Sequence, residues 1–141
     1  MAARSPETSQ TGSDHAAQRV PAPRPIRVLI VDDQESFRSA ARLVVEMTDG
    51  FETVGEASDG AAALELARAL DPHLVLLDMR LPVIDGVEVT RRLCRDHPGI
   101  RVLALSTHDD YELRALAAGA VAFVAKAAFG PDSILAAWRD S

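Results

Sequence analysis

Two alternating patterns of apolar and polar positions run along the chain from residue 26 to its end. Short runs of consecutive apolar residues are typical of strands that are buried on both faces. Longer segments with apolar residues three and four positions apart are typical of amphipathic helices. The predicted strands cover residues 26–31, 51–57, 73–77, 101–105 and 120–125. The predicted helices cover residues 36–47, 58–70, 86–96, 109–119 and 130–140.

Residues at the ends of the helical segments fit these boundaries. Ser58 or Asp59 is suited to cap the second helix and Asp109 the fourth, because their side-chain oxygens can accept a bond from a free backbone N–H. Gly119 is suited to the end of the fourth helix, where a left-handed residue is common. Pro131 fits the first turn of the last helix, which is short.

The alternation of strands and helices predicts a single α/β domain. Consecutive strands joined by helices favour right-handed crossovers and a parallel, doubly wound sheet with helices on both faces. In such sheets the ligand binds at the carboxyl ends of the strands, at the point where the strand order reverses. Functional residues are therefore expected directly after the predicted strands.

Chemically active residues follow four of the five predicted strands. They are Asp32 and Asp33 after the first strand, Asp78 after the third, Ser106 and Thr107 after the fourth, and Lys126 after the fifth. The second strand ends at Ala57, which offers no reactive group. His108, two residues past Ser106, could touch the edge of the site but is interpreted as a solvated loop residue. Each residue taken alone has an ordinary explanation as a helix cap or a solvated strand end. Together, on four strand ends, they favour a site.

This set of residues suits a phosphoryl group held beside a divalent cation. Three carboxylates at one edge repel one another and raise one another's pKa, and a divalent cation relieves that repulsion. The available ligands are hard oxygens, which favour Mg²⁺ over zinc or copper. Lys126 adds a second positive charge and Ser106 a hydroxyl donor. A carboxylate nucleophile, charge neutralisation and a donor are the parts that phosphoryl transfer requires.

The composition indicates which part of the chain folds, where the protein is located and which partners it does not bind. Residues 1–25 are rich in Pro, Ser, Thr and Gln and are predicted to be a disordered leader, so the folded domain covers residues 26–141. A net charge of −6 gives no general attraction to nucleic acid or to anionic lipid. The single cysteine excludes an intrachain disulfide, and no apolar run is long enough to span a bilayer. We expect a cytoplasmic protein that binds neither membrane nor nucleic acid directly.

Residues 26 to about 139 resemble the receiver domain of bacterial two-component response regulators, of the NarL/LuxR type. The matching stretches are VLIVDD, GEASDG, VLLDMRLPVIDG, VLALS and AGAVAFVAK. The resemblance implies a flavodoxin-like (βα)5 fold whose five-stranded parallel sheet has the order 2-1-3-4-5. Thr107 departs from the family, because many receivers have Ala or Gly there.

The resemblance also assigns a role to each residue of the predicted site. Asp78 would be the phosphoacceptor, receiving the phosphoryl group of a sensor histidine kinase. Mg²⁺ would be held by Asp32, Asp33, Asp78 and the backbone carbonyl of Arg80. Ser106 and Lys126 would contact the phosphoryl oxygens, and Phe123 would be the switch aromatic that turns inward when Ser106 moves.

The function implied by the resemblance is a switch that controls transcription. Phosphorylation would alter the surface formed by the helix over 109–119, the strand over 120–125 and the helix over 130–140, which would bind an output domain or a second copy. The chain would not be an enzyme beyond its own phosphotransfer and slow dephosphorylation. The alternative is an interaction module that works without phosphorylation. A phosphatase of the haloacid-dehalogenase type is disfavoured, because it needs an aspartate where this chain has Arg80.

Overall fold

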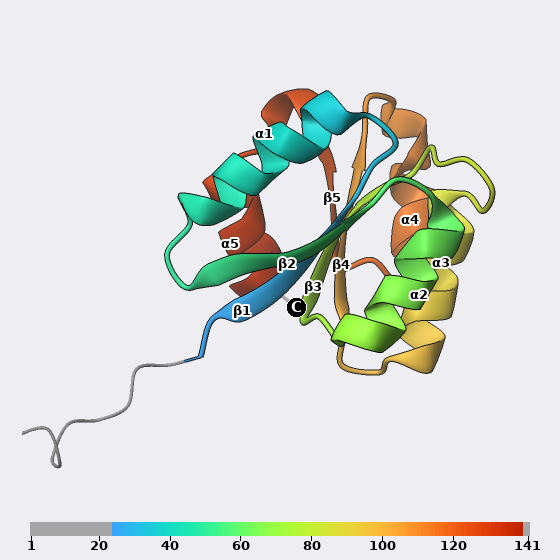
Figure 1. Cartoon of the computed structure of the whole chain (residues 1–141). Coiled ribbons are helices and arrows are strands. Elements are labelled where there is room, and N and C mark those ends of the chain that lie inside the picture. The colour runs from blue at the N-terminus through green and yellow to red at the C-terminus, as the bar shows by residue number, and fades with distance from the viewer. Residues whose placement is uncertain (1–23, 140–141) are drawn as a thin grey trace, which may run out of the picture.

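The computed structural model describes residues 24–139, which form a parallel sheet between two layers of helices (Figure 1). The strands are β1 Ile26–Val31, β2 Phe51–Ala57, β3 Leu74–Asp78, β4 Arg101–Ser106 and β5 Ala122–Ala125. The helices are α1 Glu35–Glu46, α2 Gly60–Leu70, α3 Gly86–Asp96, α4 Glu112–Ala118 and α5 Pro131–Arg139, with 3₁₀ turns at Asp109–Tyr111 and Lys126–Ala128. Of the predicted leader, only residues 24 and 25 are among the described residues.

The order of the strands confirms the predicted fold class. All four neighbouring pairs are parallel, and the order is β2-β1-β3-β4-β5. Helices α1 and α5 cover one face of the sheet, and α2, α3 and α4 cover the other (Figure 1). The order reverses between β1 and β3, so the crevice for a ligand lies above the carboxyl ends of these central strands.

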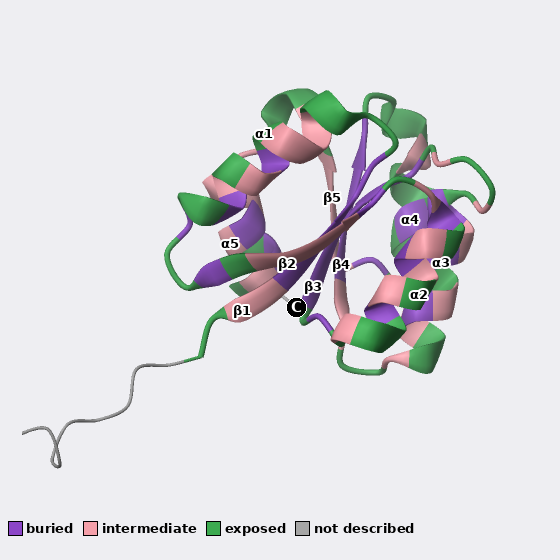
Figure 2. Cartoon of the chain, in the orientation of Figure 1, coloured by how far each residue is buried: buried purple, intermediate pink, exposed green. Residues whose placement is uncertain are grey.

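The core consists of two apolar layers, one on each face of the sheet (Figure 2). Because side chains alternate along a strand, Leu29 and Val31 of β1 face one layer while Val28 and Ile30 face the other. All five residues of β3 are buried, and this strand ends in Asp78. The central strand therefore carries a carboxylate to the edge of the core.

The predicted ends of the helices are confirmed in three cases and wrong in one. Helix α5 begins at Pro131, as predicted. The Asp59 carboxylate accepts the Ala62 N–H at 2.8 Å and caps α2, and Gly119 ends α4 with a φ of 118°. Asp109 does not cap α4. It begins a 3₁₀ turn, and α4 starts only at Glu112 without a side-chain cap. The tighter three-residue turn uses Asp109 as a backbone acceptor, which moves it out of the capping position.

Helix α5 is short but well packed against the sheet. Ile134 and Ala137 are fully buried. The Trp138 ring meets Phe51 edge to face at a centroid distance of 6.3 Å, and the Arg101 guanidinium lies over it at 4.1 Å. These contacts close the core beside the first residues of β2 and β4. Within residues 24–139, no helix has the length and apolar character needed to cross a membrane.

Candidate functional site

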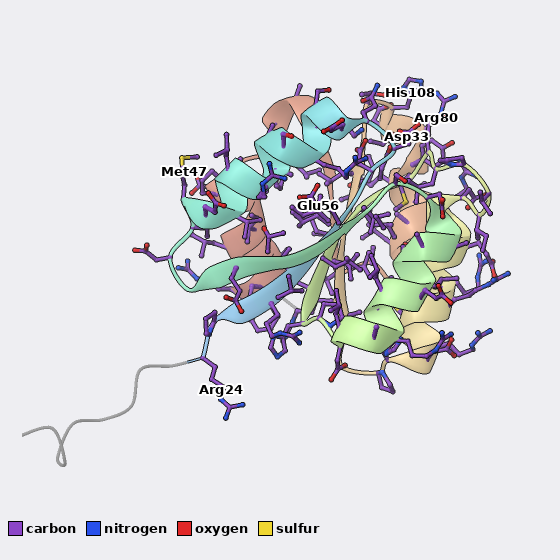
Figure 3. The ribbon with its side chains drawn as sticks, in the orientation of Figure 1. Arg24, Asp33, Met47, Glu56, Arg80 and His108 are labelled. Atoms are coloured by element: carbon purple, nitrogen blue, oxygen red, sulfur yellow. The ribbon has the colours of Figure 1, made fainter. Side chains whose placement is uncertain are left out.

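The carboxyl ends of the strands bring the predicted acidic residues together. Carboxylate oxygens of Asp32, Asp33 and Asp78 all lie within 4.8 Å of one another. Figure 3 shows Asp33 at this edge of the sheet, beside Arg80 and His108. The fold places these residues because β1 and β3 are neighbours in parallel register, with Val31 opposite Leu77.

Asp32 is held by its surroundings, whereas Asp33 is exposed. The backbone N–H of Asp32 donates to the Ala57 carbonyl at 3.0 Å, and its Oδ1 accepts the Gln34 N–H at 2.8 Å. Its buried Oδ2 receives no hydrogen bond from the described residues and lies 2.5 Å from Nζ of Lys126. One carboxylate is thus fixed in the floor of the site, and the next one faces solvent.

Asp78 combines a buried position with a raised pKa. Burial is the largest cause, and the nearby Asp32 charge also raises the pKa. The Arg80 N–H, which donates to Oδ1 at 3.1 Å, and the Lys126 ammonium, 3.4 Å from Oδ2, oppose the shift. Desolvation of the charged form outweighs these partners.

The raised pKa predicts that Asp78→Asn stabilises the metal-free domain at neutral pH. A carboxyl whose pKa is raised by folding stabilises the fold when protonated, and this contribution is lost as the pH rises through the folded pKa. In EDTA at pH 7 the variant should melt at a higher temperature than the wild type. The difference should narrow as the pH falls toward the unfolded value of about 3.9. Thermal unfolding at several pH values tests this, and a variant that melts lower at pH 7 would contradict it.

Lys126 connects the two buried carboxylates. Its side chain is 10% exposed, and Nζ pairs with Asp32 and Asp78. The ammonium also lies 4.6 Å from the centre of the Phe37 ring, which in turn packs against Phe129 at 5.9 Å. A cation over an aromatic face is stabilised by the ring's quadrupole. Helix α1 therefore helps to hold the ammonium over the acidic cluster.

Ser106 and Phe123 differ in how far they are buried. Ser106 is buried at the end of β4, where its Oγ accepts the His108 N–H at 3.0 Å. Phe123 is half-buried on β5, opposite Ala104 of β4, and packs against the same apolar layer as Tyr111. Phe123 thus belongs to the apolar packing of this layer, and its switch role stays a prediction.

A histidine bridge crosses the mouth of the site. Nη1 of Arg80 lies 2.8 Å from Nε2 of His108, and Nδ1 of His108 lies 3.1 Å from the Thr107 hydroxyl. Because a guanidinium only donates, Nε2 must accept, and the neutral ring then donates from Nδ1 to Thr107. His108 is an exposed loop residue, as predicted, and this bridge also brings it to the edge of the site. The available signal was its position two residues past Ser106, just after the end of the strand that pairs with β3.

The residues surround an open cleft of about 500 Å³. Its lining combines acidic, basic and apolar side chains: Asp33, Gln34, Asp78, Arg80, Leu81, Pro82, Asp85, Thr107, Tyr111 and Lys126. Asp85 also accepts the Glu88 N–H at 3.0 Å and caps α3. The cleft is large enough for a phosphoryl group, with carboxylates and the ammonium at its base.

The loop between β3 and α3 forms one wall of the cleft in a constrained conformation. Val83 has a φ of 73°, and the Ile84 N–H donates to the Pro82 carbonyl at 2.9 Å, which closes a γ-turn around an exposed β-branched residue. Such turns are strained and persist where the surroundings enforce them. The Gly86 N–H donates to the Met79 carbonyl at 3.0 Å and holds the loop against the end of β3.

Two supporting residues were not anticipated from the sequence. Glu56, one residue before the apparently inert end of β2, accepts hydrogen bonds from Arg38 and Arg42 of α1. Arg38 also donates to the backbone carbonyl of Asp32 at 2.7 Å. The signal was a pair of arginines four positions apart on a helix that follows the acidic turn.

The comparisons with known proteins agree with this geometry. The response regulator receiver domain model matches residues 28–139. Response regulator GacA from Pseudomonas viridiflava is 41% identical over 105 residues, covering 73% of this chain and 49% of that protein. The chain thus spans about half the length of the curated relatives it matches.

Two solved structures are informative. The receiver domain of NarL from Mycobacterium tuberculosis has a TM-score of 0.76 and 36% identity, covering 82% of this chain and 95% of that one. A response regulator from Burkholderia pseudomallei with a phosphorylated aspartic acid and a calcium ion has a TM-score of 0.69 and 28% identity, covering 79% and 65%. With the family model matching most of the chain, we conclude that the protein belongs to the response regulator receiver domain family.

Proposed function

We propose that this receiver domain accepts a phosphoryl group on Asp78 in the presence of Mg²⁺. The observation that carries the proposal is the juxtaposition at the end of β3. The Asp78 carboxylate lies with those of Asp32 and Asp33 within 4.8 Å, and the Lys126 ammonium is 3.4 Å away. The phosphorylated aspartic acid and calcium ion of the Burkholderia pseudomallei regulator support the same chemistry.

The donor set fits a hard divalent cation. The candidate ligands are carboxylate oxygens, and Mg²⁺ prefers oxygen ligands and retains several waters. Asp32 offers a buried Oδ2 that lies 2.5 Å from the Lys126 ammonium, and Asp33 is exposed at the cleft. Asp32, Asp33, Asp78 and the backbone carbonyl of Arg80 would hold the ion. Bound there, Mg²⁺ would offset the negative charge of the phosphoryl oxygens.

The chain's own residues would then carry the transfer. A carboxylate oxygen of Asp78 bonds to phosphorus while the bond to the donor's leaving atom breaks, and that atom keeps the electron pair. The leaving atom is the imidazole nitrogen of a kinase phosphohistidine, or the acetate oxygen of acetyl phosphate. Lys126, already at Asp78, pairs with a phosphoryl oxygen, and Ser106 donates its hydroxyl to another.

The readout would be the surface formed by α4, β5 and α5. Ser106 ends β4 beside β5, and Phe123 lies on β5 next to α4 in the apolar layer, so movement of Ser106 can reach this surface. Leu113 and Leu116 of α4 are exposed there, three positions apart. We propose that an output domain or a second copy binds this surface and that the result is control of transcription.

The proposed setting is the cytoplasm, where a sensor histidine kinase presents its phosphohistidine. Direct binding of nucleic acid by this chain is not proposed. Its net charge is −6, and the described helices are packed on the sheet. Catalysis of any other reaction is not proposed either, since the phosphoryl group stays on the protein until water removes it.

Intact-mass spectrometry after incubation with acetyl phosphate and Mg²⁺ tests the proposal. The wild type should gain one phosphoryl adduct that requires Mg²⁺, and Asp78→Asn should gain none. Asp85→Asn is the matched control, because Asp85 lines the same cleft but its Oδ1 serves as the α3 cap, a role an amide oxygen retains. It should still be phosphorylated. A wild type without an adduct would favour an interaction module that works without phosphorylation.

A further inference from the structure

Arg38 of α1 connects this helix to the turn after β1 and to the end of β2, through hydrogen bonds to Asp32 and Glu56. Nη1 of Arg38 donates to the Asp32 carbonyl at 2.7 Å, and Nε donates to Oε1 of Glu56 at 3.3 Å. The backbone N–H of Arg38 donates to the Gln34 carbonyl at 3.1 Å. The side chain is only 17% exposed. Arg38 therefore closes the turn from β1 to α1 and fastens it to the carboxyl end of β2.

The turn that Arg38 closes carries both carboxylates of the β1 end. The N–H of Asp32 is fixed by Ala57 and its Oδ1 by Gln34, so the carbonyl bonded to Arg38 completes the anchoring of this residue. That carbonyl belongs to the peptide that leads into Asp33. The exposed Asp33 carboxylate takes its position from the orientation of this peptide.

Glu56 orients the Arg38 guanidinium toward the turn that follows β1. It accepts hydrogen bonds from Arg38 and from Arg42, one helical turn later on α1. Figure 3 shows Glu56 between α1 and the sheet, apart from Asp33 and Arg80. The carboxylate offsets charge on the two arginines and fixes the planar fork in one orientation.

We propose that Arg38 is a positioning residue for the divalent cation site, and that Glu56 orients it. Arg38 bonds to the backbone of a ligand residue and not to a ligand carboxylate, so it acts through the geometry of the turn. The inference rests on the proposed function, because it concerns the metal site of that function. Mutating a group that orients a metal ligand typically lowers the metal affinity by about tenfold or more.

Charge and geometry predict opposite effects at this position, which makes the proposal testable. A cation near the site repels a second cation, so if only charge matters, Arg38→Gln binds metal more tightly and Arg38→Lys is unchanged. If geometry matters, both variants bind more weakly. Lysine keeps the charge but lacks the fork needed to reach the Asp32 carbonyl and Glu56 together.

The experiment measures Mn²⁺ binding to the unphosphorylated full chain by electron paramagnetic resonance of the free ion. Arg38→Lys and Arg38→Gln should each bind Mn²⁺ roughly tenfold more weakly than the wild type. Arg42→Gln is the matched control, since it removes the same charge from the same helix and the same Glu56 partner but leaves the Asp32 carbonyl bonded. Its affinity should equal that of the wild type. Thermal unfolding in EDTA verifies that each variant is folded.

A second readout separates metal binding from chemistry. In the acetyl phosphate reaction, Arg38→Lys should need roughly tenfold more Mg²⁺ for half-maximal rate, while the rate at saturating Mg²⁺ equals that of the wild type. Wild-type affinity in Arg38→Lys, or tighter binding in Arg38→Gln, would overturn the positioning role alone. Absence of Mn²⁺ binding in the wild type would instead refute the metal site of the proposed function, and the inference with it.

Discussion

Lys126→Met should lower the free energy of unfolding in EDTA at pH 7 by about 3–5 kcal/mol, the usual cost of removing one partner from a buried ion pair. The ammonium pairs with Asp32 and Asp78, whose side chains are 1% and 6% exposed. Methionine nearly keeps the volume, so the loss comes from two buried carboxylates left without a counter-charge. Urea unfolding of wild type and variant measures the difference.

The same experiment has a matched surface control and a metal-dependent arm. Arg91→Met removes a cation whose side chain is 57% exposed and pairs with Glu88 on α3, so it should change stability by less than about 1 kcal/mol. Mg²⁺ should restore part of the stability of Lys126→Met, because it supplies positive charge at the same carboxylates. A loss in Lys126→Met no larger than in the control would show that Lys126 does not compensate the buried charges.

The second large effect is expected at Gly86. A Cβ at this position would lie 2.3 Å from the Asp78 carbonyl oxygen and 2.5 Å from Cα of Met79. Both are backbone atoms of the β3 end, and the Met79 N–H is bonded to the Leu105 carbonyl at 2.9 Å, so neither can move aside freely. Gly86→Ala should therefore cost about 3 kcal/mol or more, at the upper end of overpacking effects.

Gly99→Ala is the control for this substitution. A Cβ at Gly99 would meet nothing within 4 Å, so the variant should match the wild type in urea unfolding. Gly86→Ala should also weaken Mn²⁺ binding, because the loop it displaces carries the Arg80 carbonyl. Equal stability of the two alanine variants would mean that the loop between β3 and α3 adapts more readily than its contacts indicate.

The fold and the acidic cluster were predictable because their signals are local. Strands β1, β3 and β4 are largely runs of apolar residues, and parallel connections bring the carboxyl ends of the strands to one edge. Asp32, Asp33 and Asp78 follow directly from that rule, as does the position of Lys126. None of these placements requires knowledge of a side-chain contact.

The supporting contacts were not predictable in the same way, because they depend on how separate elements pack. Arg38 reaches Glu56 across 18 positions, and His108 reaches Arg80 across 28. The helical pattern marks Arg38 only as a solvent-facing charge, and Arg80 lies in a loop that has no periodic pattern. At Asp109 two local preferences compete, since an aspartate can cap a helix or begin a 3₁₀ turn, and the path of the chain from β4 decides between them.

The charge balance at the β3 end has a consequence for how the domain exists in a cell. Three carboxylates and one ammonium leave an excess of two negative charges, which is the charge that a single divalent ion neutralises. Under the proposed function, folding and ion binding are linked equilibria, and the population of folded protein would depend on the free Mg²⁺ concentration. With Mg²⁺ bound as proposed, the unphosphorylated domain would already be a ligand-bound species before any phosphodonor arrives, and magnesium depletion would act on its stability as well as on its chemistry.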